Sequence, residues 1–131
     1  MKFLSIYKTP ERRVPPTQEE MDAMAKLIEE GMKAGWLLGT EGCLPTALGA
    51  RVRHDEGKIT VTDGPFSESK EVVGGFAILR ANSKEEAIEL TRRFLQVAGQ
   101  FAAHGECELR QVFEAAEYPG QCPGRKAAAA V

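Results

Sequence analysis

The 131-residue sequence predicts one α+β domain in which an antiparallel sheet carries two helices on one face. Two observations lead to this fold class. Two stretches have apolar residues at helical spacing behind a helix-capping pattern, and short runs rich in branched and aromatic residues lie before, between and after them. A chain of this length suits a single compact domain that needs neither a metal nor a disulfide framework to fold.

The composition is that of an ordinary globular protein, with 43% hydrophobic and 27% charged residues. The formal net charge is −2 and the basic doublets are scattered, so we expect no nucleic-acid partner. The apolar run at Met1–Tyr7 is too short for a signal peptide or a membrane span, and we expect no membrane association. The cysteines form no C-x-x-C pair and are odd in number, which favours reduced thiols and a cytoplasmic location. They are Cys43, Cys107 and Cys122.

The first strand and the first helix are predicted near the start of the chain. Phe3 to Tyr7 is rich in aromatic and branched residues, which is typical of a buried strand. Thr17 and Glu20 have the spacing of a capping box, in which a hydroxyl and a carboxylate satisfy free backbone N–H groups where a helix begins. Gly35 is expected to end this helix. The apolar residues between these limits form one helical stripe: Met21, Met24, Ala25, Ile28 and Met32.

A loop and a hairpin are predicted next. The glycine and proline content of residues 36–45 indicates a loop, with apolar residues that pack onto the domain. Residues 51–54 and 58–62 alternate in polarity on either side of Asp55-Glu56-Gly57, whose glycine can adopt a positive φ. This pattern predicts two antiparallel strands joined by a tight turn.

The second half of the chain predicts a strand, a helix and a strand. Val72 to Leu79 reads as a buried strand, and residues 106–114 as a half-exposed final strand. Ser83 and Glu86 repeat the capping-box spacing. The second apolar stripe, which ends near Gly99, consists of Ala87, Leu90, Phe94 and Val97 or Ala98. Residues 118–131 have no core-forming pattern, so we expect a domain over residues 1–117 followed by a C-terminal tail.

This order of strands and helices is typical of a ferredoxin-like plait, with two helices covering one face of the sheet. The other face needs cover because the predicted strands are apolar. A second copy of the same sheet is the simplest cover, and it gives a twofold homodimer with the sheets packed face to face.

The segment Asp63-Gly64-Pro65-Phe66 is the first candidate for a functional site. Gly64 permits unusual backbone angles, Pro65 fixes φ, and Phe66 can form the wall of an apolar ligand pocket. A carboxylate held beside an aromatic ring suits general acid or base chemistry, which makes Asp63 the candidate catalytic residue. The alternative stays open that Asp63 accepts hydrogen bonds from the backbone of its own turn.

Three other residues are candidates for ligand binding. Lys70 and Glu71 could orient a charged substrate, although such neighbours often form a solvated ion pair. Glu41, in the glycine-rich segment 39–42, could line the same cleft or belong to a surface turn. His54 and His104 lack the spacing of metal ligands and read more readily as surface histidines. We expect no metal, and no nucleotide-binding or serine-hydrolase motif indicates a cofactor or a nucleophile.

The stretch Asp63-Gly64-Pro65-Phe66, followed by residues 67–71 and Gly74-Gly75-Phe76, resembles the signature of the DGPF-domain branch of the YCII-related proteins. The opening residues 1–3, the segments 39–42 and 44–45, and the closing residues 106–114 are also similar, so the resemblance covers roughly residues 1–117. It implies a dimeric α+β barrel, the fold of proteins like muconolactone isomerase.

The same resemblance implies less about activity. Relatives are suspected of enzymatic work through a His and Asp pair in the dimer cleft, and some are associated with alternative sigma factors. Asp63 matches the acidic residue, whereas the first predicted helix contains no histidine. Two functions therefore stay open: binding of a small organic molecule near the Asp63 loop with acid or base chemistry, and a non-catalytic regulatory or interaction module.

Overall fold

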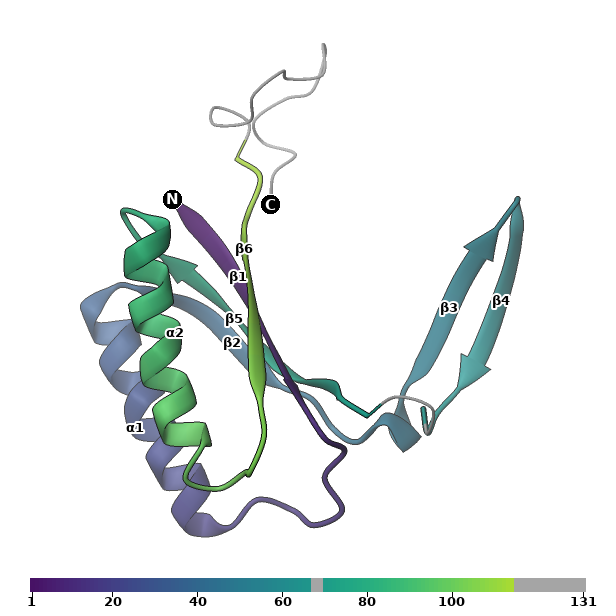
Figure 1. Cartoon of the computed structure of the whole chain (residues 1–131), viewed down its shortest axis with the longest axis horizontal. Helices are drawn as coiled ribbons and strands as arrows, with labels where there is room; N and C mark the ends of the chain where they lie inside the picture. The colour runs from purple at the N-terminus through teal and green to yellow at the C-terminus, as the bar shows by residue number, and fades with distance from the viewer. Residues whose placement is uncertain (67–69, 115–131) are drawn as a thin grey trace.

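The computed structural model describes residues 1–66 and 70–114. In chain order the elements are β1 (Lys2–Thr9), α1 (Gln18–Ala34), β2 (Leu37–Gly42), the short 3₁₀ helix η1 (Thr46–Leu48), β3 (Ala50–Asp55), β4 (Lys58–Asp63), β5 (Val72–Arg80), α2 (Lys84–Ala98) and β6 (Glu106–Gln111). Both helices lie on one face of a four-stranded sheet, and the β3–β4 hairpin stands away from it (Figure 1). The predicted α+β plait is confirmed. The predicted end of the domain at residue 117 and the tail over 118–131 lie outside the described residues.

The helix limits predicted from capping patterns are confirmed. The Thr17 hydroxyl accepts from the Glu20 N–H at 3.2 Å, and the Ser83 hydroxyl accepts from the Glu86 N–H at 3.1 Å. Gly35 ends α1 with a φ of 83°, a left-handed conformation that favours glycine. Local sequence signals are sufficient to place these helix boundaries.

The sheet differs from the expectation in one strand. Its order is β2-β5-β1-β6, and every neighbouring pair is antiparallel. Residues 36–45 were expected to form a loop, but β2 pairs with β5 as an edge strand because Leu37 is buried beside Leu79. The predicted hairpin forms as expected, with Glu56 and Gly57 at positive φ, yet β3 and β4 pair only with each other. Burial of one leucine thus outweighs the turn-like composition of the segment.

The core is packed most tightly at one end of the sheet's helix-covered face. Phe3, Leu37 and Leu79 come from three adjacent strands, lie side by side in the pairing register, and are 2%, 7% and 3% exposed. Ala81 and Ala87 complete this buried cluster, against which both helices pack. The hydrophobic effect therefore acts mainly at this end of the domain.

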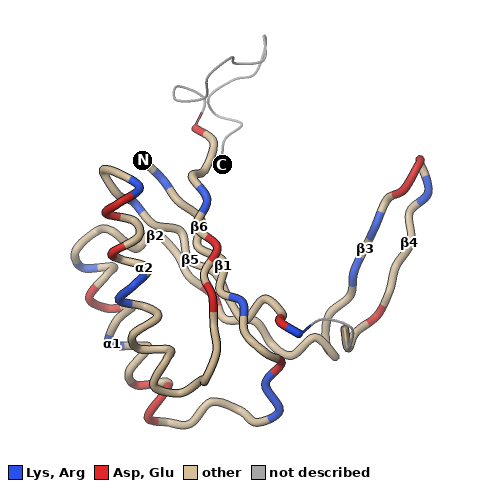
Figure 2. Tube along the Cα trace, viewed as in Figure 1, with Lys and Arg blue, Asp and Glu red and all other residues tan. Residues whose placement is uncertain are grey.

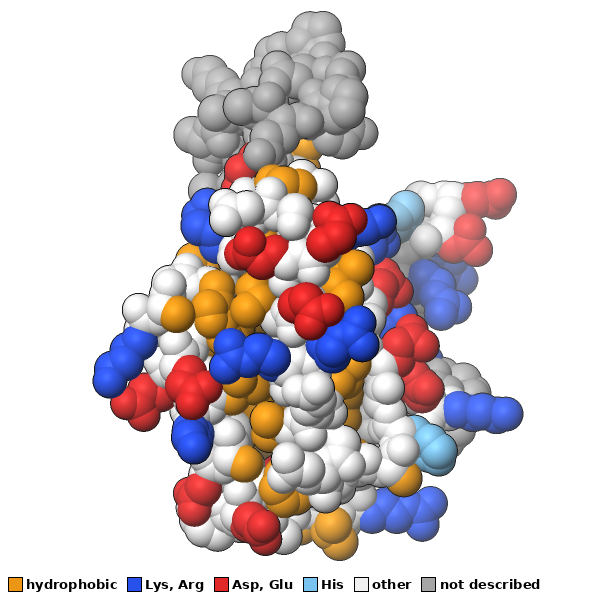
Figure 3. All heavy atoms as spheres, turned by 60° about the vertical axis from the view of Figure 1, so that its left-hand side comes forward, with side chains coloured by type: hydrophobic (Ala, Val, Ile, Leu, Met, Phe, Trp, Pro, Cys, Tyr) orange, Lys and Arg blue, Asp and Glu red, His pale blue; other side chains and the backbone are white. Residues whose placement is uncertain are grey.

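Helix α1 is rotated relative to the apolar stripe predicted for it. Met21 and Met32 are 47% and 53% exposed, whereas Glu20, Leu27 and Gly31 are buried. A Cβ on Gly31 would come within 2.8 Å of the Trp36 ring, so the helix approaches β2 through this glycine. Figure 3, with the helix side turned forward, shows hydrophobic side chains exposed among charged ones. The prediction of the inward face was therefore wrong for Met21 and Met32, because contact at Gly31 sets the rotation.

The sheet face opposite the helices is apolar in its middle and charged toward β6. Leu4 pairs with Ile78 and Ile6 with Phe76, which is 38% exposed. On β6 this face carries charge, and the Glu108 carboxylate accepts from Lys8 at 2.9 Å and from Arg110 at 3.2 Å. Lysine and arginine alternate with acidic residues along the chain, without one dominant sign (Figure 2). We refer to this surface as the open face.

The Lys8–Glu108 pair predicts a pH-dependent contribution to stability. The hydrogen bond and charge of Lys8 hold the pKa of Glu108 below its ordinary value, and Glu108 in turn raises the pKa of Lys8. The stabilisation is therefore lost in acid as Glu108 gains a proton, and in strong base as Lys8 loses one. We expect the melting temperature of the wild type to exceed that of Glu108→Gln slightly, with a plateau from about pH 5 to about pH 10. A difference that stays constant below pH 4 and above pH 11 would contradict the pairing.

Candidate functional site

Small residues on the helix-covered face of the sheet leave an interior cavity beyond the packed core. One row across the strands reads Thr40, Ala77, Ser5 and Leu109, and the next reads Gly42, Gly75, Tyr7 and Cys107. The neighbouring row, which carries Leu37, Leu79 and Phe3, fills the space beneath the helices. The cavity therefore opens where the side chains on this face of the sheet are small, and we refer to this part of the sheet as the floor of the cavity.

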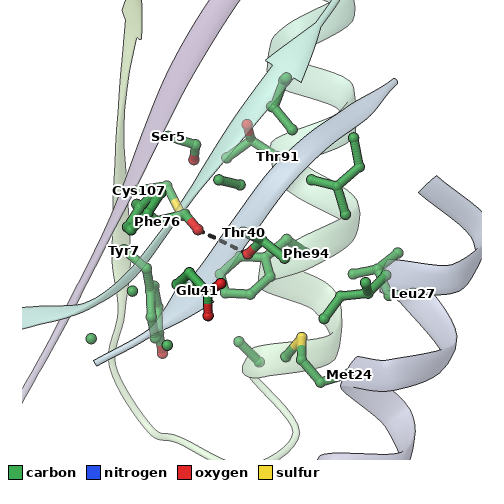
Figure 4. A pocket seen from close by; sticks show the side chains of 18 of the residues that line it. Ser5, Tyr7, Met24, Leu27, Thr40, Glu41, Phe76, Thr91, Phe94 and Cys107 are labelled. Atoms are coloured by element: carbon green, nitrogen blue, oxygen red, sulfur yellow. Dashed lines mark hydrogen bonds between the residues drawn. The ribbon is translucent and has the colours of Figure 1, made fainter. Parts of the chain in front are cut away.

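The cavity has a volume of about 400 Å³ and lies between this floor and the two helices. Met24 and Leu27 from α1 and Phe94 from α2 point across it toward the strands (Figure 4). A volume of this size is in the range of pockets that hold small organic ligands. Exposed residues of the lining mark its mouth: Arg12, Pro16, Met21, Glu41 and Gly42.

Aromatic side chains define two walls of the cavity. Tyr7 and Phe94 meet edge to face, with ring centroids 5.1 Å apart and planes at 82°. Trp36, the single tryptophan of the chain, also lines the cavity, with the Arg93 guanidinium 5.5 Å from its ring centroid. An apolar or aromatic molecule would thus find aromatic contacts from β1, α2 and the α1–β2 connection.

An ion pair lines the mouth of this largely apolar cavity. The Glu20 side chain is only 12% exposed, and one guanidinium nitrogen of Arg12 donates to both of its carboxylate oxygens, at 2.7 and 2.5 Å. Glu20 was predicted as a capping-box residue. Its backbone N–H does bond to Thr17, but its carboxylate is engaged with Arg12. A buried carboxylate is costly unless paired, so Arg12 is what allows Glu20 to face inward.

The remaining polar groups of the lining are mostly engaged with the protein itself. The Thr40 hydroxyl donates to the Phe76 carbonyl at 2.8 Å (Figure 4), and the Thr91 hydroxyl donates to the Ala87 carbonyl at 2.9 Å. Burial raises the pKa of the Cys107 thiol, so this thiol stays protonated and unreactive at neutral pH. Among the described residues of the lining, the Glu20–Arg12 pair is therefore the one charged pair that the polar end of a ligand could contact.

The Asp-Gly-Pro-Phe loop is held by a network centred on Thr46. The Glu11 carboxylate accepts from the Thr46 N–H at 2.9 Å and from its hydroxyl at 2.8 Å. The same hydroxyl accepts from the Phe66 N–H at 3.2 Å, and the Gly64 N–H donates to the Gly49 carbonyl at 3.0 Å. A Cβ on Gly64 would lie 1.7 Å from the Thr46 carbonyl oxygen, so only glycine fits. The loop is thereby fixed against η1.

A second, shallower hollow of about 660 Å³ lies beside this loop, and we refer to it as the loop hollow. Phe66 and Glu71 line it together with Lys8, Cys43 and residues around η1. The Arg51 guanidinium, which also lines it, stacks over the Phe66 ring with 4.0 Å to the ring centroid. The hollow is therefore more polar and more exposed than the interior cavity.

The structure distributes the five predicted site residues over different places. Phe66 and Glu71 share the loop hollow, and Glu41 lines the interior cavity while itself being exposed. Asp63 ends β4 opposite Ala50, and Asp63 and Lys70 are exposed and lie outside both linings.

The two histidines lie outside both cavities. His54 is exposed on β3, and His104 is exposed before β6, where its backbone carbonyl accepts from the Thr9 hydroxyl at 3.1 Å. Residues 1–66 and 70–114 include no group of three His, Cys, Asp or Glu side chains that could hold a metal ion.

Sequence reasoning missed the residues that define the interior cavity. Glu20 was masked by its capping spacing, and Tyr7 and Phe94 read as ordinary core positions. The signal that could have been used is the placement of Ser5, Gly75 and Ala77 among large residues in buried strands. It becomes informative only once the strand register is known, because register decides which small residues lie side by side.

Comparison with known proteins gives the family of this chain. Residues 1–116 match the YCII-related domain, a range that includes every residue the structure describes. Over 92 residues, 70% of each chain, the sequence is 33% identical to an uncharacterised protein of Rhizobium meliloti (strain 1021). In the part of the chain that the structure describes, no helix is long and apolar enough to cross a membrane. The match over residues 1–116 shows that this chain belongs to the YCII-related family.

Proposed function

We propose that the protein binds a small organic molecule with a mainly apolar body in the interior cavity. The observation that carries this proposal is a void of about 400 Å³ directly beside a tightly packed core. A void lowers stability because its lining loses packing contacts. Larger side chains at Ser5 and Ala77, which pair across β1 and β5, could have filled it, and a space kept open at this cost favours a ligand site.

Acid or base chemistry on the bound molecule is part of this proposal. Two carboxylates, Glu20 and Glu41, line the cavity, and Tyr7 adds a phenolic hydroxyl. A bound molecule whose polar end reaches the mouth could form hydrogen bonds with these carboxylates. Proton transfer by a positioned carboxylate is the simplest reaction that such a site supports.

Filling the cavity tests the proposal. We expect Ala77→Leu to raise the free energy of unfolding by about 1 kcal/mol, because its side chain enters the void, and to abolish ligand binding. Binding is measured by calorimetry with 4-ethylphenol and by the indole N–H resonance of Trp36. Ile78→Val, on the opposite face of β5, is the control and should bind as the wild type does. Unchanged binding by Ala77→Leu would show that the ligand sits elsewhere.

A homodimer is the second part of the proposal. The open face exposes an apolar centre built from Ile6, Phe76 and their neighbours, and the hairpin exposes Val52 and Val61 at 68% and 65%. These surfaces would be covered if two sheets packed face to face, with each hairpin reaching the partner. The resemblance of Asp63-Gly64-Pro65-Phe66 to the DGPF-branch signature, which implies a dimeric α+β barrel, supports the same arrangement.

The dimer predicts a specific response to charge. Phe76→Lys places an ammonium in the middle of the open face, so we expect sedimentation at micromolar concentration to change from the dimer mass to the monomer mass. Met32→Lys, on the helix side, is the matched control and should remain dimeric. A wild-type chain that sediments as a monomer would refute the dimer.

The loop hollow is a second candidate location for chemistry, favoured by the shared position of Phe66 and Glu71 beside Lys8. Asp63 pairs with Ala50 and Lys70 directly precedes Glu71, and both of these neighbours line the hollow, so Asp63 and Lys70 would act at its edge, with Asp63 as the acid. The non-catalytic alternative, an interaction module, draws on the exposed hairpin. Asp63→Asn tests the loop hollow against the interior cavity: it should impair a function located at the loop hollow and leave ligand binding in the interior cavity unchanged.

A further inference from the structure

If the interior cavity is the ligand site, as proposed above, its walls also restrict the chemistry of the ligand. We propose that the ligand is uncharged and carries one polar end, a hydroxyl or N–H, which donates a hydrogen bond to the Glu20 carboxylate. The apolar body of the ligand then extends inward between Met24 and Phe94.

Glu20 is more deeply buried than Met21, its neighbour on α1. Both line the cavity, but Met21 is 47% exposed at the mouth, while Glu20 is 9% exposed. This arrangement reverses the usual preference of methionine for burial and of glutamate for water. Such reversals are expected at functional sites, where stability is given up for chemistry.

The Glu20 carboxylate keeps acceptor positions that Arg12 does not occupy. A carboxylate offers about four lone-pair positions, and Arg12 occupies one on each oxygen through a single nitrogen. The remaining positions can accept from a donor inside the cavity. Of the two carboxylates in the lining, Glu41 is exposed and Glu20 is buried, so Glu20 is the acceptor that a ligand donor would meet just inside the mouth.

The charge of Glu20 is balanced by Arg12. Arg12 and Glu20 together are neutral, and the other inward side chains are apolar or uncharged apart from Glu41 at the exposed mouth. An anionic or cationic ligand would bring a charge without a counter-ion into this space, at a high desolvation cost. A neutral ligand avoids that cost and still satisfies its own donor.

A matched set of ligands tests the charge rule. The set comprises 4-ethylphenol, 4-ethyltoluene, 4-ethylbenzoate and 4-ethylbenzylamine, which share a ring and differ only at one end. For the wild type at neutral pH, we expect calorimetry to show 4-ethylphenol binding about tenfold or more tightly than either charged compound. The hydroxyl should also give it an advantage over 4-ethyltoluene of about threefold to tenfold.

Two substitutions should redirect this preference in opposite directions. Glu20→Gln leaves the Arg12 charge unbalanced, so 4-ethylbenzoate should gain about tenfold relative to 4-ethyltoluene. Arg12→Gln leaves the Glu20 charge unbalanced, so 4-ethylbenzylamine should gain by a similar factor. Arg12→Lys keeps the charge and should keep the wild-type preference. Unchanged affinity for 4-ethyltoluene shows that each variant retains the cavity.

The outcomes separate this inference from the proposed function. If none of the four compounds binds the wild type, the cavity is not a ligand site and both proposals fail. If all four bind and neither substitution redirects the preference, the cavity remains the site but Glu20 does not select the ligand. Opposite shifts in the two variants, with Arg12→Lys unchanged, support the assignment.

Discussion

Phe3→Ala is expected to lower the free energy of unfolding by about 3–5 kcal/mol, the usual loss when a buried phenylalanine is truncated. Phe3 is 2% exposed and lies in the central strand β1, with Leu79 as its partner on β5. Removing the ring from the packed end of the core would leave a void that its rigid neighbours cannot fill. The loss is measured by urea unfolding followed by circular dichroism.

The matched control for Phe3→Ala is Met32→Ala on the exposed side of α1. Met32 is 53% exposed, so the free energy of unfolding should stay within about 0.5 kcal/mol of the wild-type value. The account of the core would be wrong if both substitutions cost the same, because the two positions differ mainly in burial.

Gly64→Ala is expected to destabilise the protein by about 3 kcal/mol, the upper part of the range for overpacking. Its Cβ would lie 1.7 Å from the Thr46 carbonyl oxygen and 2.6 Å from the carbonyl carbon, and both are backbone atoms that cannot turn aside. The loop must therefore leave η1, and the bond from the Phe66 N–H to the Thr46 hydroxyl should break. Chemical unfolding and the amide resonances of Thr46 and Phe66 report these changes.

Gly49→Ala is the control for Gly64→Ala in the same loop region. A Cβ on Gly49 would meet its nearest heavy atom at 3.6 Å, an ordinary contact, and its φ of −113° suits any residue. We expect little change in stability. If Gly64→Ala is as well tolerated as Gly49→Ala, the loop is not fixed against η1 as described.

The elements of this fold follow largely from local sequence signals. Thr17, Ser83 and Gly35 mark helix ends because capping depends on a few adjacent residues. Strand β2 could not be predicted in this way, since Gly39 and Gly42 read as a loop and only pairing with β5 makes the segment extended. Likewise, the rotation of α1 depends on contact between Gly31 and Trp36, which are joined through the turn at Gly35.

The candidate site was less accessible to sequence reasoning than the fold. The Asp63 loop stood out because its residue types are unusual, and the structure gives Gly64 and Phe66 a clear role in fixing that loop. The interior cavity arises instead from absent side chain volume at Ser5, Gly75 and Ala77, which lie on two different strands. Small residues do not form a recognisable functional motif, so a cavity of this kind can be identified only when the strand register and the packing of the helices are known.

The central claim is that the interior cavity receives the ligand, and methionine-methyl NMR tests it most directly. The chain has four methionines, of which Met21 and Met24 line the cavity while Met32, about three turns after Met21 on α1, is 53% exposed and outside the lining. On titration with 4-ethylphenol, we expect the methyl resonances of Met24 and Met21 to shift in a saturable manner, with ligand-to-methyl cross-relaxation at Met24 and no change at Met32. Saturable binding by calorimetry without any shift at Met24 would contradict the claim, because the molecule would then occupy another site.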